Sequence, residues 1–126
     1  MSLDLRDAPA DSGPIAVSAH PSDFSVQVLT VAPDASRVVV AGEIDMATGP
    51  EVREALTRQM AEGRDVVLDL TGVTFLDSSG LAILVEAINA AETTAWNLGV
   101  VSDLPLPVRR LLELTGLEAA LPLVEG

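Results

Sequence analysis

Residues 65–81 read DVVLDLTGVTFLDSSGL, and this stretch decides the fold. It begins with Asp65–Leu70, a short β-branched and mostly apolar run of the kind found in strands that are covered on both faces. It ends in Asp77-Ser78-Ser79-Gly80, after which apolar residues recur at the spacing of one helix face: Leu81, Leu84, Val85 and Ile88. The stretch therefore predicts a buried strand that leads through a short connection into a helix.

The segments on either side continue this pattern. Upstream, residues 24–28 and 37–41 flank a turn cluster at 33–36 and predict an antiparallel hairpin. An apolar stripe then predicts a helix that ends near Gly63: Val52, Leu56 and Met60. Downstream we expect a strand over 96–101, a helix from between 103 and 107 to Gly116, and a short strand or extended tail over 121–124. Alternating strands and helices require parallel pairing, so one mixed sheet with helices packed on it is expected.

The chain has 126 residues, which suggests one domain. Residues 1–22 mix Asp, Ala, Pro, Ser and Gly with no sustained period, which is typical of a flexible N-terminal leader. The folded domain is expected to cover residues 23–126. Because aromatic residues make up only 2% of the chain, its core must be built from aliphatic side chains.

Charge and composition exclude several classes of protein. The net charge is −12, so nucleic acids and anionic membrane surfaces, which attract Lys and Arg, are not expected partners. No apolar run reaches 18 residues, and the N-terminus lacks the pattern of a secretory signal. The chain also contains no cysteine, which fits a reducing compartment. We therefore expect a cytoplasmic protein, and a monomer when it is free.

The inventory of reactive side chains argues against an enzyme. The chain has no Lys, Cys or Tyr, and its single histidine, His20, lies in the leader. Phosphate-binding loops, Schiff-base and thiolate chemistry and His-rich zinc sites are therefore excluded, and no cofactor or metal is expected. A hydrolase elbow requires glycine two residues before its serine, where this chain has Leu76.

The motif Asp77-Ser78-Ser79-Gly80 is the first candidate site, because it enters a helix at the edge of a parallel sheet where functional residues usually gather. We expect Ser78 to be the N-cap residue, and Gly80 to leave the backbone open to approach. A phosphate on Ser78 would be tolerated at the positive end of the helix dipole. The same four residues are also typical of an ordinary helix cap, and the pattern alone leaves both interpretations open.

Asp45 is the second candidate. It follows a strand and precedes a helix whose start fits a capping box, Thr48 with Glu51, so it is expected near Ser78 at the same edge of the sheet. An aspartate at such a position is more commonly a turn or cap residue. Asp45 and Asp77 together would also suit a magnesium pocket like that of aspartate-phosphorylated receivers, but such domains need a lysine and this chain has none.

Four blocks of the sequence, in this order, resemble the anti-sigma-factor antagonists of the STAS domain family: residues 42–45 (GEID), 67–70 (VLDL), 75–81 (FLDSSGL) and 108–117 (VRRLLELTGL). The resemblance covers about residues 24 to 124. It implies a single α/β domain with a mixed sheet of four to five strands and helices packed largely on one side. In that family the unphosphorylated antagonist binds an anti-sigma factor that is also a serine kinase, which frees the sigma factor.

The resemblance also assigns roles to residues. The kinase would phosphorylate Ser78 and so end binding, and a PP2C-type phosphatase would remove the phosphate. Asp77 and Ser79 would flank the acceptor, Gly80 would give access to it, and Asp45 would contribute to kinase binding or phosphorylation. The alternative function is a STAS-type scaffold, or a domain that binds a nucleotide or lipid, with Ser78 serving only as a helix cap.

Overall fold

The computed structural model describes residues 24–125. The expected leader, residues 1–22, and His20 lie outside the described residues. The described chain forms, in order, β1 (Ser25–Ala32), β2 (Ala35–Ile44), α1 (Gly49–Ala61), β3 (Asp65–Leu76), α2 (Ser78–Thr93), β4 (Leu98–Val101), α3 (Leu106–Thr115), the short 3₁₀ helix η2 (Glu118–Ala120) and β5 (Leu123–Val124). This order confirms the predicted alternation of strands and helices.

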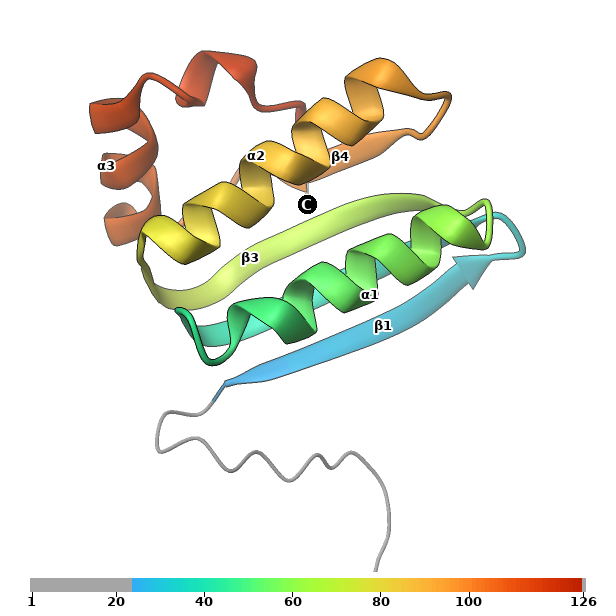
Figure 1. The fold of residues 1–126 in the computed structure, drawn as a ribbon, viewed down its shortest axis with the longest axis horizontal. Helices are drawn as coiled ribbons and strands as arrows, with labels where there is room; N and C mark the ends of the chain where they lie inside the picture. The colour runs from blue at the N-terminus through green and yellow to red at the C-terminus, as the bar shows by residue number, and fades with distance from the viewer. Residues whose placement is uncertain (1–23, 126) are drawn as a thin grey trace, which may run out of the picture.

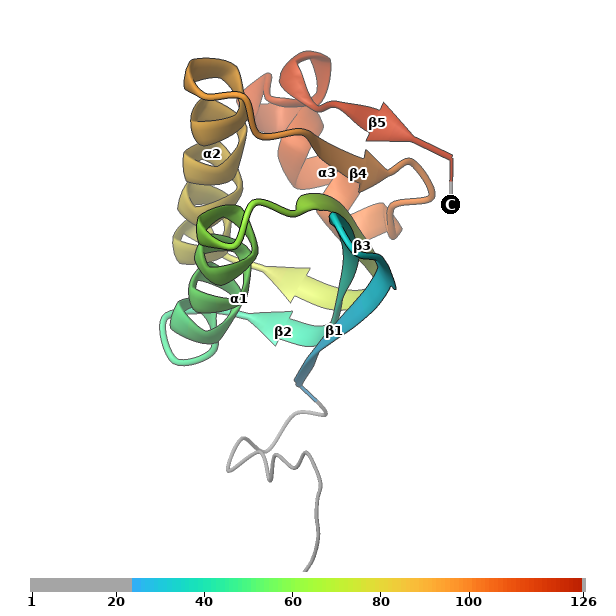
Figure 2. The same cartoon turned by 90° about the vertical axis from the view of Figure 1, so that its right-hand side faces the viewer.

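The strands form one five-stranded sheet in the order β1-β2-β3-β4-β5. β1 pairs with β2 antiparallel, as the turn cluster between them predicts, and the other neighbours pair in parallel. The sheet is therefore mixed, as expected. Figure 2 shows α1 and α2 side by side over one face of the sheet, and these two helices contact each other.

The third helix lies at one end of the sheet. α3 packs against β3, and Figure 1 places it at the end where β3 passes into α2. Its apolar residues Val108 and Leu112 are buried in the core. α3 ends at Gly116, which has a φ of +75°, a conformation that glycine adopts without strain. Within residues 24–125, no helix is both long and apolar enough to cross a membrane.

The core is largely aliphatic, as the composition requires. Its most deeply buried side chains come from the middle strands and from α3, and they include Val38, Val40, Leu68 and Val108. Two of the three aromatic residues, Phe24 and Trp96, also lie in this cluster, whereas Phe75 is 49% exposed.

β3 is longer than the apolar run predicts, because it continues from Leu70 to Leu76. The simple alternation of buried residues breaks where the register between β2 and β3 shifts, first between Val39 and Ala41 and again between Gly42 and Glu43. Gly72 lies opposite Ala41, and a Cβ built on Gly72 would be 3.1 Å from that of Ala41. The irregular register explains why the second half of β3 does not read as a strand in the sequence.

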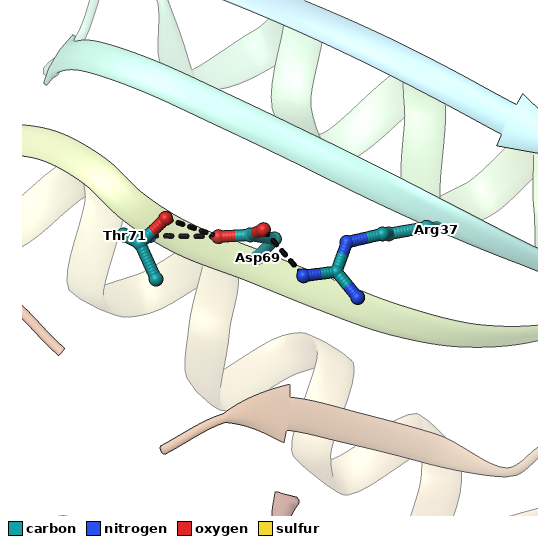
Figure 3. A network of polar contacts seen from close by, with 3 residues as sticks. All are labelled: Arg37, Asp69 and Thr71. Atoms are coloured by element: carbon teal, nitrogen blue, oxygen red, sulfur yellow. Dashed lines mark hydrogen bonds and ion pairs between the residues drawn. The ribbon is translucent and has the colours of Figure 1, made fainter. Parts of the chain in front are cut away.

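A polar network lies beside the first of these shifts (Figure 3). The Asp69 carboxylate accepts hydrogen bonds from the N–H and hydroxyl of Thr71, at 2.9 and 2.7 Å, and forms an ion pair with Arg37 at 2.7 Å. Burial alone would raise the pKa of Asp69, but the hydrogen bonds from Thr71 and then Arg37 outweigh it, so its pKa is lowered. The network ties β2 to β3 just before the register shift.

Candidate functional site

The candidate site lies where β2 and β3 end. Ile44 and Leu76, the last residues of these strands, are partners in the parallel register. The N–H of Asp77 donates a hydrogen bond of 3.2 Å to the carbonyl oxygen of Ile44. Asp45 and Asp77 therefore follow directly from paired residues of adjacent strands. The structure brings the two candidate segments together at the carboxyl edge of the sheet, as the sequence predicts.

Asp77 is the residue that caps α2. Its Oδ1 atom accepts hydrogen bonds from the backbone N–H groups of Ser79 (2.8 Å) and Gly80 (3.1 Å). The expectation that Ser78 is the N-cap was therefore wrong by one residue. Aspartate and serine are about equally good N-cap residues, so the sequence Asp-Ser-Ser does not say which of them takes the position.

Ser78 is consequently the first residue of α2, and it is exposed. Its hydroxyl makes no hydrogen bond to any of the described residues 24–125. Ser79 is half-buried and contributes its N–H to the Asp77 cap. The hydroxyl of Ser78 therefore belongs to an exposed residue at a helix N-terminus, where a negative group is favoured by the dipole.

Gly80 is buried, which corrects the expectation that it opens the backbone to approach. A Cβ at this position would lie 2.4 Å from Leu76 Cδ1, 2.9 Å from Ile44 Cγ2 and 3.1 Å from the Ile44 carbonyl oxygen. The first turn of α2 thus packs against the ends of β2 and β3 through a position that has room for no side chain. Gly80 therefore determines where Ser78 lies, and it does not provide access to Ser78.

Asp45 organises the turn between β2 and α1. Its Oδ1 atom accepts hydrogen bonds from the N–H groups of Ala47 (2.9 Å) and Thr48 (3.0 Å). The Thr48 hydroxyl is turned back toward β2, where it donates to the carbonyl oxygen of Glu43 at 2.8 Å and accepts from the N–H of Asp45 at 2.9 Å. The predicted capping box of Thr48 and Glu51 was therefore wrong, because the threonine makes no side-chain cap.

Two apolar side chains beside these polar residues were missed by the sequence analysis. Met46 is 79% exposed and follows Asp45, and Phe75 is 49% exposed two residues before Asp77. The sequence does contain a signal for these two residues, because each is a large apolar residue next to a polar motif at the end of a strand. Exposed large apolar side chains that have polar residues beside them are common on protein-interaction surfaces.

The site offers a hydroxyl nucleophile, two carboxylates and exposed apolar surface. Among the described residues, no group of three His, Cys, Asp or Glu side chains is placed to hold a metal ion. The arrangement is suited to accepting a charged group on Ser78 and to contacting another protein.

The chain is similar to known proteins in both sequence and fold. Residues 28–125 match the family described as "Mlab, STAS domain". The chain is 39% identical over 93 residues to the anti-sigma-B factor antagonist of Staphylococcus aureus strain NCTC 8325 / PS 47, covering 71% of this chain and 82% of that protein.

Two solved structures are also similar. An anti-sigma factor antagonist from Mycobacterium paratuberculosis has a TM-score of 0.70 at 34% identity, covering 85% of this chain and 90% of that one. The Bacillus cell fate determinant SpoIIAA, solved in its phosphorylated form, has a TM-score of 0.64 at 16% identity, covering 81% of this chain and 91% of that one. The second likeness shows the fold alone.

Proposed function

Because this chain belongs to the STAS domain family, among its anti-sigma factor antagonists, we propose that it binds a serine-kinase anti-sigma factor while Ser78 carries a free hydroxyl. Phosphorylation of Ser78 by that kinase, with ATP as the donor, releases the partner, and a PP2C-type phosphatase restores binding. The chain thereby regulates transcription that depends on a sigma factor, in the cytoplasm, by switching partners rather than by catalysis.

The observation that carries this proposal is the exposed Ser78 hydroxyl at the first position of α2. Asp77 holds the end of the helix through the N–H groups of Ser79 and Gly80. A phosphate on Ser78 therefore removes no cap and disturbs no buried contact. The domain keeps its fold in both states, and only its docking face changes. A protein of the same fold has been solved in a phosphorylated form.

Charge explains why phosphorylation ends binding. A phosphoserine adds about −1.5 to −2 charges at neutral pH, here beside the Asp77 carboxylate and on a chain whose net charge is already −12. Burying such a group in an interface without a matching cation is strongly unfavourable. A loss of about 1.4 kcal/mol already weakens binding tenfold.

The neighbouring residues have distinct parts in the proposal. Asp45 and Ser79 contact the kinase, and the exposed side chains of Met46 and Phe75 supply apolar contacts on either side. Asp77 contacts the kinase and also positions Ser78 by capping α2. Gly80 acts indirectly, because its packing against Ile44 places Ser78 next to the Asp45 turn.

The proposal is tested by phosphorylation in vitro. The protein is incubated with ATP and each anti-sigma factor kinase of the cell that produces it, and its intact mass is then measured. We expect one added phosphate on the wild type and on Ser79→Ala, and none on Ser78→Ala. If a kinase binds the protein but adds no phosphate, or if Ser78→Ala is still modified, the switch is rejected and the scaffold or ligand-binding function is favoured instead.

A further inference from the structure

Met46 is a large apolar residue that the fold leaves in solvent. It lies in the turn between β2 and α1, where Gly, Asn, Asp, Pro and Ser are the usual residues, and it is 79% exposed. The other methionine within residues 24–125, Met60, is half-buried and packs against the core. Met46 therefore adds little to the packing of the domain, and its apolar side chain is available for contact with another molecule.

The backbone of the turn is held on both sides of Met46. The carboxylate of Asp45 accepts hydrogen bonds from the N–H groups of Ala47 and Thr48, at 2.9 and 3.0 Å. The carbonyl oxygen of Asp45 also accepts a bond of 2.7 Å from the N–H of Gly49. The turn is thus closed by its own hydrogen bonds, and none of them uses the side chain of Met46.

Met46 and Ser78 occupy matching positions at the edge of the sheet. Ile44 and Leu76 are partners in the parallel register of β2 and β3, and Met46 and Ser78 each follow one of these partners by two residues. The N–H of Asp77 donates to the carbonyl oxygen of Ile44, which ties the two segments together. A protein that docks over Ser78 is therefore placed to cover Met46 as well.

The sulfur of Met46 is also exposed to chemical attack. Methionine and cysteine are the residues that peroxides oxidise at sulfur, and exposure governs how readily they react. The chain has three methionines and no cysteine. Of the two methionines that the structure describes, Met46 is exposed and Met60 is half-buried. Oxidation of the folded domain should therefore fall on Met46 before Met60.

We propose that Met46 is a site of reversible oxidation by hydrogen peroxide, and that its sulfoxide weakens docking of the anti-sigma factor kinase. The second half of this inference rests on the proposed function. In the reaction the Met46 sulfur attacks one oxygen of the peroxide, so an S–O bond forms as the O–O bond breaks. The sulfur is oxidised by two electrons, and the departing hydroxide takes the proton from the transferred oxygen and leaves as water.

The change in polarity explains the effect on docking. A sulfoxide presents a polar oxygen where the thioether of Met46 presents apolar surface. A partner surface that receives an apolar side chain offers this oxygen no donor, and an unsatisfied buried polar group weakens binding by about fivefold or more. Oxidation of Met46 thus acts in the same direction as phosphorylation of Ser78. Reduction of the sulfoxide restores the apolar contact.

The site of oxidation is measured first. The full-length protein alone is treated with dilute hydrogen peroxide, the peroxide is removed, and peptide mapping by mass spectrometry follows each methionine separately. We expect Met46 to be oxidised several-fold faster than Met60, which serves as the internal control because it packs against the core. Equal rates for the two methionines overturn the inference.

Binding is measured next, by titrating untreated kinase anti-sigma factor with each protein before and after the peroxide treatment. We expect the Kd of the wild type and of Met60→Leu to rise at least about fivefold, and the Kd of Met46→Leu to be the same before and after treatment. Methionine sulfoxide reductases should restore the original Kd of the wild type. Thermal unfolding of the oxidised wild type should match that of the untreated protein, because Met46 lies outside the core.

The outcomes distinguish this inference from the proposed function. If the untreated wild type binds no anti-sigma factor kinase, both are overturned. If the wild type binds the kinase equally well before and after complete oxidation of Met46, or if Met46→Leu loses as much affinity as the wild type, the inference alone is overturned and the proposed function stands.

Discussion

The N–H of Asp77 donates a hydrogen bond to the carbonyl oxygen of Ile44 across 3.2 Å. This bond joins the ends of β2 and β3 after their last paired residues. The next residue after each partner is a candidate site residue, Asp45 on one side and Ser78 on the other. The site is therefore formed by the ends of two paired strands rather than by one loop. A change that shifts the end of either strand should affect the segments that carry Asp45 and Ser78 alike.

Gly80→Ala should destabilise the protein. Helix propensity alone predicts a gain of up to about 1 kcal/mol, but the new Cβ would meet Leu76 and the backbone of Ile44. Overpacking of this kind usually lowers the free energy of unfolding by about 1–3 kcal/mol. Urea unfolding, with Ser79→Ala as the neighbouring control, measures the sign directly. A variant more stable than the wild type would show that Gly80 has no packing role.

Asp77→Ala should remove the cap of α2. Two backbone N–H groups lose their acceptor, so the free energy of unfolding should fall by about 1 kcal/mol. Asp77→Asn keeps an acceptor oxygen and should lose less. Chemical denaturation of the two variants checks this order. Equal losses would mean that the carboxylate charge, and not the capping bond, stabilises the helix.

Asp45→Asn separates the structural part of Asp45 from its proposed contact with a kinase. The amide oxygen can still accept from the N–H groups of Ala47 and Thr48, so stability should change by less than about 0.5 kcal/mol. Kinase binding should weaken several-fold because the charge is lost. Calorimetric titration and thermal unfolding of the same sample give both quantities. Unchanged binding would leave Asp45 as a turn residue only.

The stability of the domain should depend on the ionisation of Asp69. Its pKa is lowered on folding, since the hydrogen bonds from Thr71 and Arg37 outweigh the effect of burial. The ionised carboxylate therefore stabilises the fold above its unfolded pKa of about 3.9, and this contribution is lost as the pH falls through the lower folded pKa.

Asp69→Asn should accordingly lower the free energy of unfolding at pH 7 by about 1–3 kcal/mol. The difference from the wild type should shrink as the solution is acidified below about pH 4. Urea unfolding at several pH values, with the exposed Asp103→Asn as control, tests this. A difference that stays constant down to the most acidic solution would contradict the assignment.

The order of elements could be predicted from the sequence because each element carries its own periodic signal. The predicted apolar stripe of α1 was confirmed, since Val52 and Leu56 are buried and Met60 is half-buried. The end of α3 at Gly116 was confirmed as well. The second half of β3 could not be predicted, because two register shifts against β2 interrupt its alternation. Such a shift depends on the neighbouring strand, which lies far away in the sequence.

At the site, the order of the strands was enough to predict that Asp45 lies near Ser78. The residue that caps α2 could not be predicted, because aspartate and serine have similar preferences for the N-cap position. Only the backbone geometry shows that Asp77 takes this position. The role of Gly80 was misread for a related reason. Glycine in a first helical turn suggests accessibility in the sequence, whereas its contact with Ile44 comes from the parallel pairing of β2 with β3.

The central claim is that charge on the Ser78 hydroxyl ends docking without altering the fold. The most direct measurement is isothermal titration of the kinase anti-sigma factor with the unphosphorylated protein and with the protein phosphorylated at Ser78, with circular dichroism of both forms. We predict identical spectra and a Kd at least about tenfold higher for the phosphorylated form, equivalent to about 1.4 kcal/mol. Equal Kd values for the two forms would contradict the account.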